Sequence, residues 1–127
     1  MKELFQTGEW KQEKHIPVIE LLEEPKRDEP LKVKLTVGKE IPHPNTTQHH
    51  ISWIEVYFLP QGEKFPYQIG RFEFASHGSS IGGADTSSVY THPEVVCSFK
   101  TGKSGKILAS SYCNIHGLWE GSLELNF

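Results

Sequence analysis

Alternation of apolar and polar residues is the clearest pattern in this chain. It is strict over residues 31–37, where leucine and valine alternate with lysine and threonine. A period of two is typical of a β-strand with one buried face. Residues 51–59 are instead apolar, β-branched or aromatic on both faces. That composition predicts a strand in the middle of a sheet.

Four further segments have strand-like patterns: residues 67–74, 94–100, 106–113 and 119–127. Turn-forming residues separate them, and helical periodicity is hard to find. The short glycine-containing stretch 101–105 predicts a hairpin between the strands on either side. Residues 23–30 are charged and bounded by prolines, which predicts a solvated loop. Together these features predict an all-β fold, an immunoglobulin-like antiparallel β-sandwich of about seven strands.

Length and composition bound the class of protein. A chain of 127 residues predicts a single domain over residues 1–127. Its net charge is −3 and it has no long basic run, which argues against nucleic-acid binding. No apolar run approaches a membrane span or a signal-peptide core, so we expect no membrane association and a cytoplasmic location.

The candidate chemistry begins with a Cys-x-x-His pair, Cys113 and His116, followed by Gly117. A tight turn at the end of a strand can aim both side chains at one point, and the glycine permits a positive φ angle. In a reducing compartment we expect Cys97 and Cys113 to be thiols or metal ligands. A disulfide between them is the alternative.

Upstream histidines extend this candidate site. His43 lies between two prolines, which favour an extended and rigid backbone. His49 and His50 would point to opposite faces of a strand, so only one of them should reach a metal. His15 directly follows Glu13 and Lys14.

One thiolate and several imidazoles from three distant segments predict a single, non-tetrahedral transition-metal centre. Four histidines and one cysteine suit a square-pyramidal iron with an open sixth position. Structural zinc sites usually close at four tetrahedral ligands. A blue-copper site uses a weak axial methionine, and Met1 is the only methionine here, although other axial groups occur. A structural zinc protein and a small electron-transfer protein therefore stay open as alternatives.

Three segments of the chain resemble the superoxide reductases in order and spacing: residues 13–17, 43–50 and 112–117. The chain is similar, more narrowly, to the one-iron neelaredoxin type. The longer desulfoferrodoxins add a rubredoxin-like domain with four cysteine ligands. No cysteine precedes Cys97, so we expect that domain and its iron to be absent.

This resemblance implies one mononuclear iron that cycles between Fe2+ and Fe3+. The implied ligands are four equatorial histidines and an axial cysteine: His15, His43, His49, His116 and Cys113. It also implies that Glu13 takes the sixth position in the resting ferric state and that Lys14 faces the open position.

The implied reaction is one-electron reduction of superoxide to hydrogen peroxide, without release of oxygen. The charge of Lys14 would attract the anion and help to stabilise and protonate the product. Charge donated by the Cys113 thiolate would favour product release. The electron would come from a donor protein such as rubredoxin, and the family resemblance implies a homotetramer. The alternative is a small iron or copper electron-transfer protein with no substrate turnover.

Structural roles are expected for the remaining histidine and tryptophan side chains. His50 is expected to face a partner or to support the ligands, and His77 to be exposed in a loop. Trp10, Trp53 and Trp119 are expected to build the core, with one of them able to shield the metal.

Overall fold

The computed structural model describes all residues from Met1 to Phe127. After a short 3-10 turn, η1 (Lys2–Leu4), the chain forms seven β-strands: β1 (Pro17–Leu21), β2 (Leu31–Val37), β3 (Ile51–Pro60), β4 (Tyr67–Glu73), β5 (Glu94–Phe99), β6 (Gly105–Cys113) and β7 (Gly117–Leu125). The all-β prediction is therefore confirmed. The structure contains no helix with the length and hydrophobicity needed to span a membrane.

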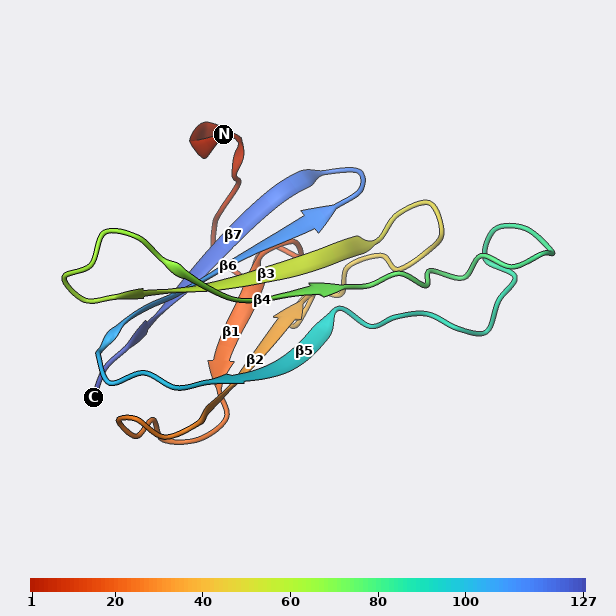
Figure 1. Cartoon of the computed structure of the whole chain (residues 1–127). Helices are drawn as coiled ribbons and strands as arrows, with labels where there is room; N and C mark the ends of the chain where they lie inside the picture. Colours follow the sequence, from red (N-terminus) through yellow and green to blue (C-terminus); the bar gives the residue numbers. More distant parts are fainter.

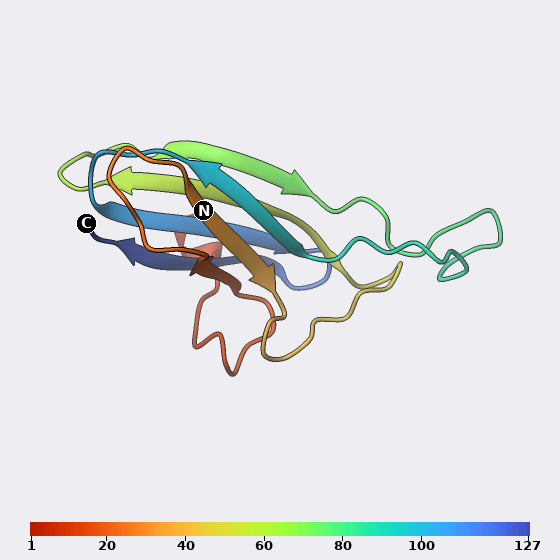
Figure 2. The ribbon, with the colours of Figure 1, turned by 90° about the horizontal axis from the view of Figure 1, so that it is seen from below.

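The strands form a two-layer sandwich (Figures 1 and 2). One sheet has the strand order β1-β2-β5 and the other has the order β4-β3-β6-β7. Every strand pair is antiparallel. The predicted antiparallel β-sandwich is the observed architecture.

The core lies between the two sheets and follows the alternation in the sequence. In β2 the leucines and valines are buried while Lys32 is exposed. Ile54, Val56 and Phe58 of β3 belong to the same buried cluster. Full burial of one such side chain stabilises the fold by roughly 1.5–3 kcal/mol.

Two elements differ from the sequence-based prediction. The strand β1 was not predicted, because its buried residues are consecutive and show no alternation. Its first residue, Pro17, is tolerated because β1 is an edge strand that pairs with β2 alone. The predicted hairpin across residues 101–105 is wrong. β5 pairs with β2, whereas β6 pairs with β3 and β7, so this connection crosses from one sheet to the other.

The positions of the cysteines and tryptophans test two further expectations about the core. Both cysteines are free, so the disulfide alternative is not formed. Cys97 packs against the core as a small hydrophobic residue. None of the three tryptophans is in the buried core, which contradicts the expectation for Trp10, Trp53 and Trp119.

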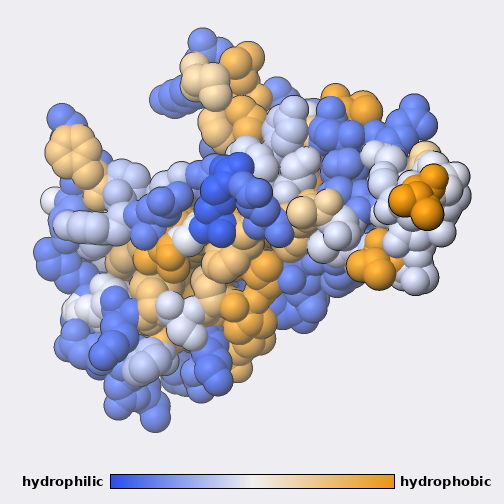
Figure 3. Space-filling view, turned by 45° about the vertical axis from the view of Figure 1, so that its right-hand side comes forward, coloured by the Kyte–Doolittle hydropathy of each residue, from blue (hydrophilic) through white to orange (hydrophobic).

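Residues 75–93, here called the excursion, leave the sandwich between β4 and β5. They project well beyond both sheets (Figures 1 and 2). Isolated hydrophobic groups stand out on this part of the surface (Figure 3), and the most exposed apolar side chains there include Ile81 and Val89. The base of the excursion lies beside the loop that joins β2 to β3 (Figure 1).

Candidate metal centre

The candidate ligands come from three segments that the sheet register brings to one end of the sandwich. His15 lies just before β1, whose first residue pairs with the last residue of β2. The 42–50 loop follows β2 and leads into β3. The first residue of β3, Ile51, pairs with Cys113 at the end of β6. The register alone therefore places these segments together.

Five of the six residues expected to bind metal converge there. The candidate ligand atoms of His15, His43, His49 and Cys113 all lie within 4.8 Å of one another. The Nδ1 atom of His116 joins them, 3.2 Å from His15 Nε2 and 3.7 Å from Cys113 Sγ. The Sγ atom of Cys113 is also 3.3 Å from His49 Nε2.

The four imidazole rings form a closed cycle. Ring centroids are 4.8 Å apart for His15 and His43, and 4.8 Å apart for His43 and His49. The cycle closes with 5.0 Å from His49 to His116 and 4.9 Å from His116 to His15. Near-equal sides are what four imidazole donors around one ion would give, and the thiol of Cys113 lies beside them as a fifth donor.

Hydrogen bonds on the outer side of two rings fix which nitrogen faces the centre. His15 Nδ1 donates to the Glu13 carboxylate at 2.6 Å, and His43 Nδ1 donates to the Pro44 carbonyl at 2.6 Å. A neutral ring that donates from Nδ1 has a lone pair on Nε2. Such outer partners are typical of histidines that bind metals.

One of the inward nitrogens has no partner within the protein. The Nε2 atom of His43 is buried and has no hydrogen-bond partner, which is rare in proteins. Nitrogen donors lie roughly 2.0–2.1 Å from a bound transition metal, so two at right angles are about 3 Å apart. The 3.2 Å between His15 Nε2 and His116 Nδ1 fits that spacing. The donor set therefore fits a metal ion.

The surroundings of three imidazoles in the centre, those of His15, His43 and His49, lower their pKa values and so favour the neutral form. Burial lowers the pKa of His43 to about 4; the hydrogen bond to the Pro44 carbonyl opposes this shift, and the charge of Lys14 adds to it. Burial also lowers the pKa of His15, although the hydrogen bond and charge of Glu13 oppose this shift. Because metal ligands must be deprotonated, these shifts favour metal binding near neutral pH.

The turn between β6 and β7 presents the thiol. Cys113 is fully buried, and the backbone N–H of His116 lies 3.3 Å from its Sγ atom. Gly117 pairs with Cys113 across the turn and has φ +79°. The tight turn anticipated from the Cys-x-x-His spacing is therefore present.

The other cysteine, Cys97, lies outside this turn. Burial raises the pKa of Cys97, which keeps it a thiol.

Asn114 joins this turn to the 42–50 loop. Its side-chain oxygen accepts the N–H of His50 at 2.8 Å, and its side-chain amide donates to the Gln48 carbonyl at 2.8 Å. Its own backbone N–H donates to the His50 carbonyl at 3.2 Å. This role of Asn114 was not predicted, although its position next to the candidate ligand Cys113 is visible in the sequence.

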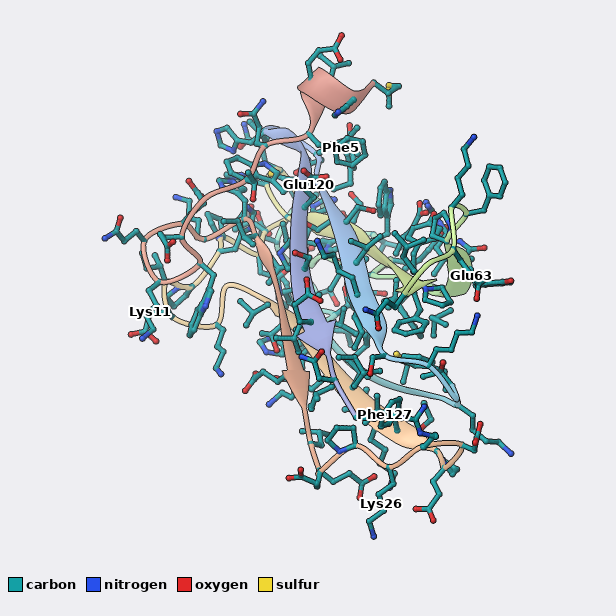
Figure 4. All side chains as sticks on the ribbon, turned by 90° about the vertical axis from the view of Figure 1, so that its left-hand side faces the viewer. Phe5, Lys11, Lys26, Glu63, Glu120 and Phe127 are labelled. Carbon is teal, nitrogen blue, oxygen red and sulfur yellow. The ribbon has the colours of Figure 1, made fainter.

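Glu13 and Lys14 lie on the segment before β1, which arches away from the sheets around Lys11 (Figure 4). The Glu13 carboxylate contacts the outer nitrogen of His15 and is not among the converging donors. Its ligation of the metal stays a prediction. Lys14 is half-buried and takes part in none of the seven ion pairs of the chain.

His50 and His77 lie outside the donor set. Their rings stack with centroids 3.5 Å apart and planes 5° from parallel. His77 is half-buried and contacts the Phe74 carbonyl through Nε2, so the expectation of an exposed loop histidine is wrong. The prediction that His49 and His50 point in different directions agrees with these contacts.

Trp119 of β7 covers one side of the centre. Its ring stacks on His15 with centroids 4.6 Å apart, and its Nε1 donates to the His116 carbonyl at 3.2 Å. The buried hydroxyl of Ser111 donates to the His15 carbonyl at 2.9 Å. The four-stranded sheet thus holds the backbone and the ring of His15.

Comparison with known proteins identifies the family. The desulfoferrodoxin family model matches residues 7–122. A putative superoxide reductase of Archaeoglobus fulgidus is 60% identical over 124 residues, which cover 98% of both chains. A superoxide reductase of Pyrococcus furiosus is 58% identical over 125 residues, with 98% of both chains covered.

A solved structure agrees with these relatives. A putative superoxide reductase of Thermotoga maritima superimposes with a TM-score of 0.95 at 51% identity, covering 99% of this chain and 96% of that one. Sequence and fold agree over nearly the whole length, and the chain belongs to the desulfoferrodoxin family.

Proposed function

We propose that this chain is a superoxide reductase, an oxidoreductase that reduces superoxide to hydrogen peroxide by one electron without releasing oxygen. The observation that carries the proposal is the closed cycle of four imidazoles with a buried thiol beside it. The superoxide reductase relatives described above support it. The fold alone would not, because one fold can host unrelated activities.

The proposed cofactor is one mononuclear iron. Its proposed ligands are four imidazoles and one thiolate: His15 Nε2, His43 Nε2, His49 Nε2, His116 Nδ1 and Cys113 Sγ. Five donors with a fourfold nitrogen plane leave one position open, whereas structural zinc sites close at four. These residues would hold the iron, which in its ferrous state would supply the electron for superoxide reduction.

Lys14 and Glu13 are the proposed catalytic residues. Lys14 has no acidic partner, so its charge is free to attract a small anion toward the open position. The same ammonium group can stabilise negative charge on the reduced substrate and deliver a proton to it. We propose that Glu13 fixes the tautomer of His15 and ligates the ferric ion.

The buried Cys113 thiolate is proposed to donate charge toward the metal and so favour release of the product. The His116 N–H beside its sulfur would moderate that donation, because hydrogen bonds to a metal-bound sulfur tune its electronics. Cys113 is therefore an electronic ligand and not a nucleophile.

The electron donor is proposed to be a protein such as rubredoxin, and the active form a homotetramer. The absence of a recognisable cosubstrate-binding motif from the sequence supports a protein donor. The family resemblance supports the tetramer. Sedimentation analysis and reduction kinetics with purified rubredoxin test these two points.

The decisive experiment measures metal and reaction on one sample. We expect natively purified protein to contain one iron per chain. After reduction, it should consume superoxide in pulse radiolysis and form peroxide without oxygen. One zinc per chain with no iron would contradict the proposal. Failure of the oxidised protein to bind cyanide or azide at the metal would favour an electron-transfer protein instead.

A further inference from the structure

Thr47, in the middle of the 42–50 loop, bonds to the excursion through both its backbone and its side chain. Its N–H donates to Asp85 Oδ1 at 2.9 Å. Its hydroxyl donates to the His77 carbonyl at 2.7 Å and accepts the Asp85 N–H at 3.1 Å. Thr47 and Asp85 thus bind each other reciprocally, across 38 residues of sequence.

Asp85 adopts an uncommon backbone conformation at this contact. Its φ angle is +54°, in the left-handed region that costs a residue other than glycine free energy. Aspartate tolerates this region better than most residues. In this conformation the Asp85 N–H and carboxylate both reach Thr47. The Tyr90 hydroxyl supports the same carboxylate oxygen from 3.4 Å.

Two further contacts join the same segments. The Asn45 side-chain amide donates to the Thr91 carbonyl at 2.9 Å, and the His50 ring stacks on His77. Residues 45, 47 and 50 therefore face the excursion, whereas the rings of His43 and His49 face the donor cluster. The excursion forms the outer wall of the loop that carries two of the four imidazoles.

This outer wall matters because the loop lacks regular secondary structure. Its own backbone provides few constraints: the N–H of Thr46 and the carbonyl of His49 are joined at 2.9 Å. Donors that are already in place before metal binding avoid the loss of chain entropy during binding. A brace on Thr47 lies four residues from His43 and two from His49, within reach of both.

We propose that Thr47 and Asp85 are positioning residues that hold His43 and His49 in their metal-binding arrangement. This inference rests on the proposed metal site. Thr47 contacts the loop and not the ion, so its influence passes through the two histidines. Removing an outer partner of a metal ligand typically weakens metal binding 10–100-fold. For this more distant brace we expect about 10-fold, the lower end of that range.

The test compares Thr47→Val with Thr101→Val. The Thr101 hydroxyl also donates to a carbonyl and accepts an N–H, both from Lys103, but it lies in the β5–β6 connection. We expect Thr47→Val to release iron to a chelator about 10-fold faster than wild type. In metal-free protein, its amides at residues 43–50 should exchange hydrogen faster. Thr101→Val should match wild type in both measurements.

Asp85 provides an independent pair of variants. Asp85→Ala removes the acceptor for the Thr47 N–H and should behave like Thr47→Val. Asp85→Asn keeps an oxygen at that position and should restore slow iron release and slow exchange. This rescue separates the brace from general damage to the fold.

Two results would overturn the inference. Exchange in residues 43–50 that is the same in Thr47→Val and wild type would show that the loop does not depend on the contact. Faster exchange with unchanged iron release would show a brace with no influence on the metal. Because exchange is measured without metal, it reports on the brace even if the proposed superoxide reduction fails.

Discussion

Two of the four histidines in the centre have a hydrogen-bond partner behind the ring that decides which nitrogen faces the donor cluster. Behind His15 that group is the Glu13 carboxylate, and behind His43 it is the Pro44 carbonyl. A carboxylate is the stronger acceptor and increases the basicity of the ring it contacts. The two rings should therefore differ in how strongly they donate to a metal.

Glu13 has two proposed roles that different substitutions can separate. Glutamine retains an oxygen that can accept the His15 N–H but is a poor ligand, whereas alanine loses both functions. We expect Glu13→Gln to retain ferrous iron and to change the ferric absorption spectrum. Glu13→Ala should also release ferrous iron, about 10–100-fold more readily. Chelator competition and visible spectroscopy measure both. A ferric spectrum in Glu13→Gln identical to wild type would rule out ligation by Glu13.

Lys14 supplies charge without being neutralised by a partner. We expect Lys14→Ala to slow association with superoxide by a few-fold, with weaker dependence on ionic strength, while metal content is unchanged. Stopped-flow or pulse radiolysis over a range of salt concentrations measures this. Lys32→Ala, on the exposed face of β2, removes the same charge elsewhere and should leave the rate unchanged. Equal rates in the two variants would remove Lys14 from the mechanism.

The depressed pKa of His43 predicts how the metal-free protein responds to acid. Unfolded His43 binds a proton near pH 6.5, but in the folded protein its pKa is about 4. Between these values the unfolded state binds more protons, so stability falls as pH falls from about 6.5 to 4. We expect metal-free His43→Gln to lose less thermal stability than wild type over this range. A dependence of stability on pH in His43→Gln equal to that of wild type would contradict the shift.

At the residue scale, the sequence predicted the converging side chains better than their surroundings. The motifs around His15, His43 and Cys113 were informative because ligand spacing is local. The tautomer of His43 is fixed by the carbonyl of the next residue, Pro44, whereas the bridge made by Asn114 depends on backbone groups of a distant segment. The position of Asn114 beside Cys113 is visible in the sequence, but its partners in the 42–50 loop are set by the fold.

At the scale of elements, the β6–β7 turn combines a structural and a chemical task. It reverses the chain within three residues, between Cys113 and Gly117, and it presents two donors. The left-handed conformation of Gly117 closes the turn. An alanine there would force the strained conformation onto an L-residue or open the turn.

Alanine substitutions at two glycines with similar backbone angles can separate the effect of backbone strain on stability from the effect of the turn on ligand position. Gly117 and Gly62 have φ angles of +79° and +84°, and a Cβ added at either would meet no atom within 4 Å. We expect Gly117→Ala and Gly62→Ala each to lower the free energy of unfolding by about 1–2 kcal/mol. Only Gly117→Ala should also change the ferric spectrum. Chemical denaturation and spectroscopy test this, and an altered spectrum in Gly62→Ala would contradict the local origin of the effect.

Strand prediction succeeded where burial is one-sided or the strand is long. β2 and β3 were located almost to the residue because their patterns reflect a buried face or a central position. β1 was not predicted, because it is short and its first three residues are all buried, so it shows no alternation. The turn at residues 101–105 has hairpin composition, but strand partners are chosen by long-range packing. Local sequence could not reveal that β5 and β6 belong to different sheets.

At the scale of the whole molecule, the metal centre joins the two layers. His15 enters from the side of the three-stranded sheet, whereas Cys113 and His116 belong to the four-stranded sheet. The 42–50 loop lies in one of the connections that cross between the layers. A metal bound to all three segments would cross-link the sheets at one end, while the apolar core holds them together elsewhere.

Removal of the metal should therefore cost stability without abolishing the fold. A ligand present at 1,000 times its dissociation constant stabilises the native state by about 4 kcal/mol. For a domain of this size that corresponds to a Tm change on the order of 10 °C. We expect chelator-treated protein to melt lower by such an amount and to recover when iron is restored. Cys113→Ser should show a much smaller shift; equal Tm values with and without metal in wild type would contradict the cross-link.

The separation of the donors along the chain has a consequence for biosynthesis. His15 and His116 are 101 residues apart, and a ribosome adds about 5–20 residues per second. His15 therefore leaves the peptidyl-transferase centre about 5–20 s before its neighbour in the donor cycle is made. The complete set exists only after nearly the whole sandwich has been translated. A metal that needs all five donors would therefore bind only after nearly the whole chain has been made, and the ions available at that point would compete for the site.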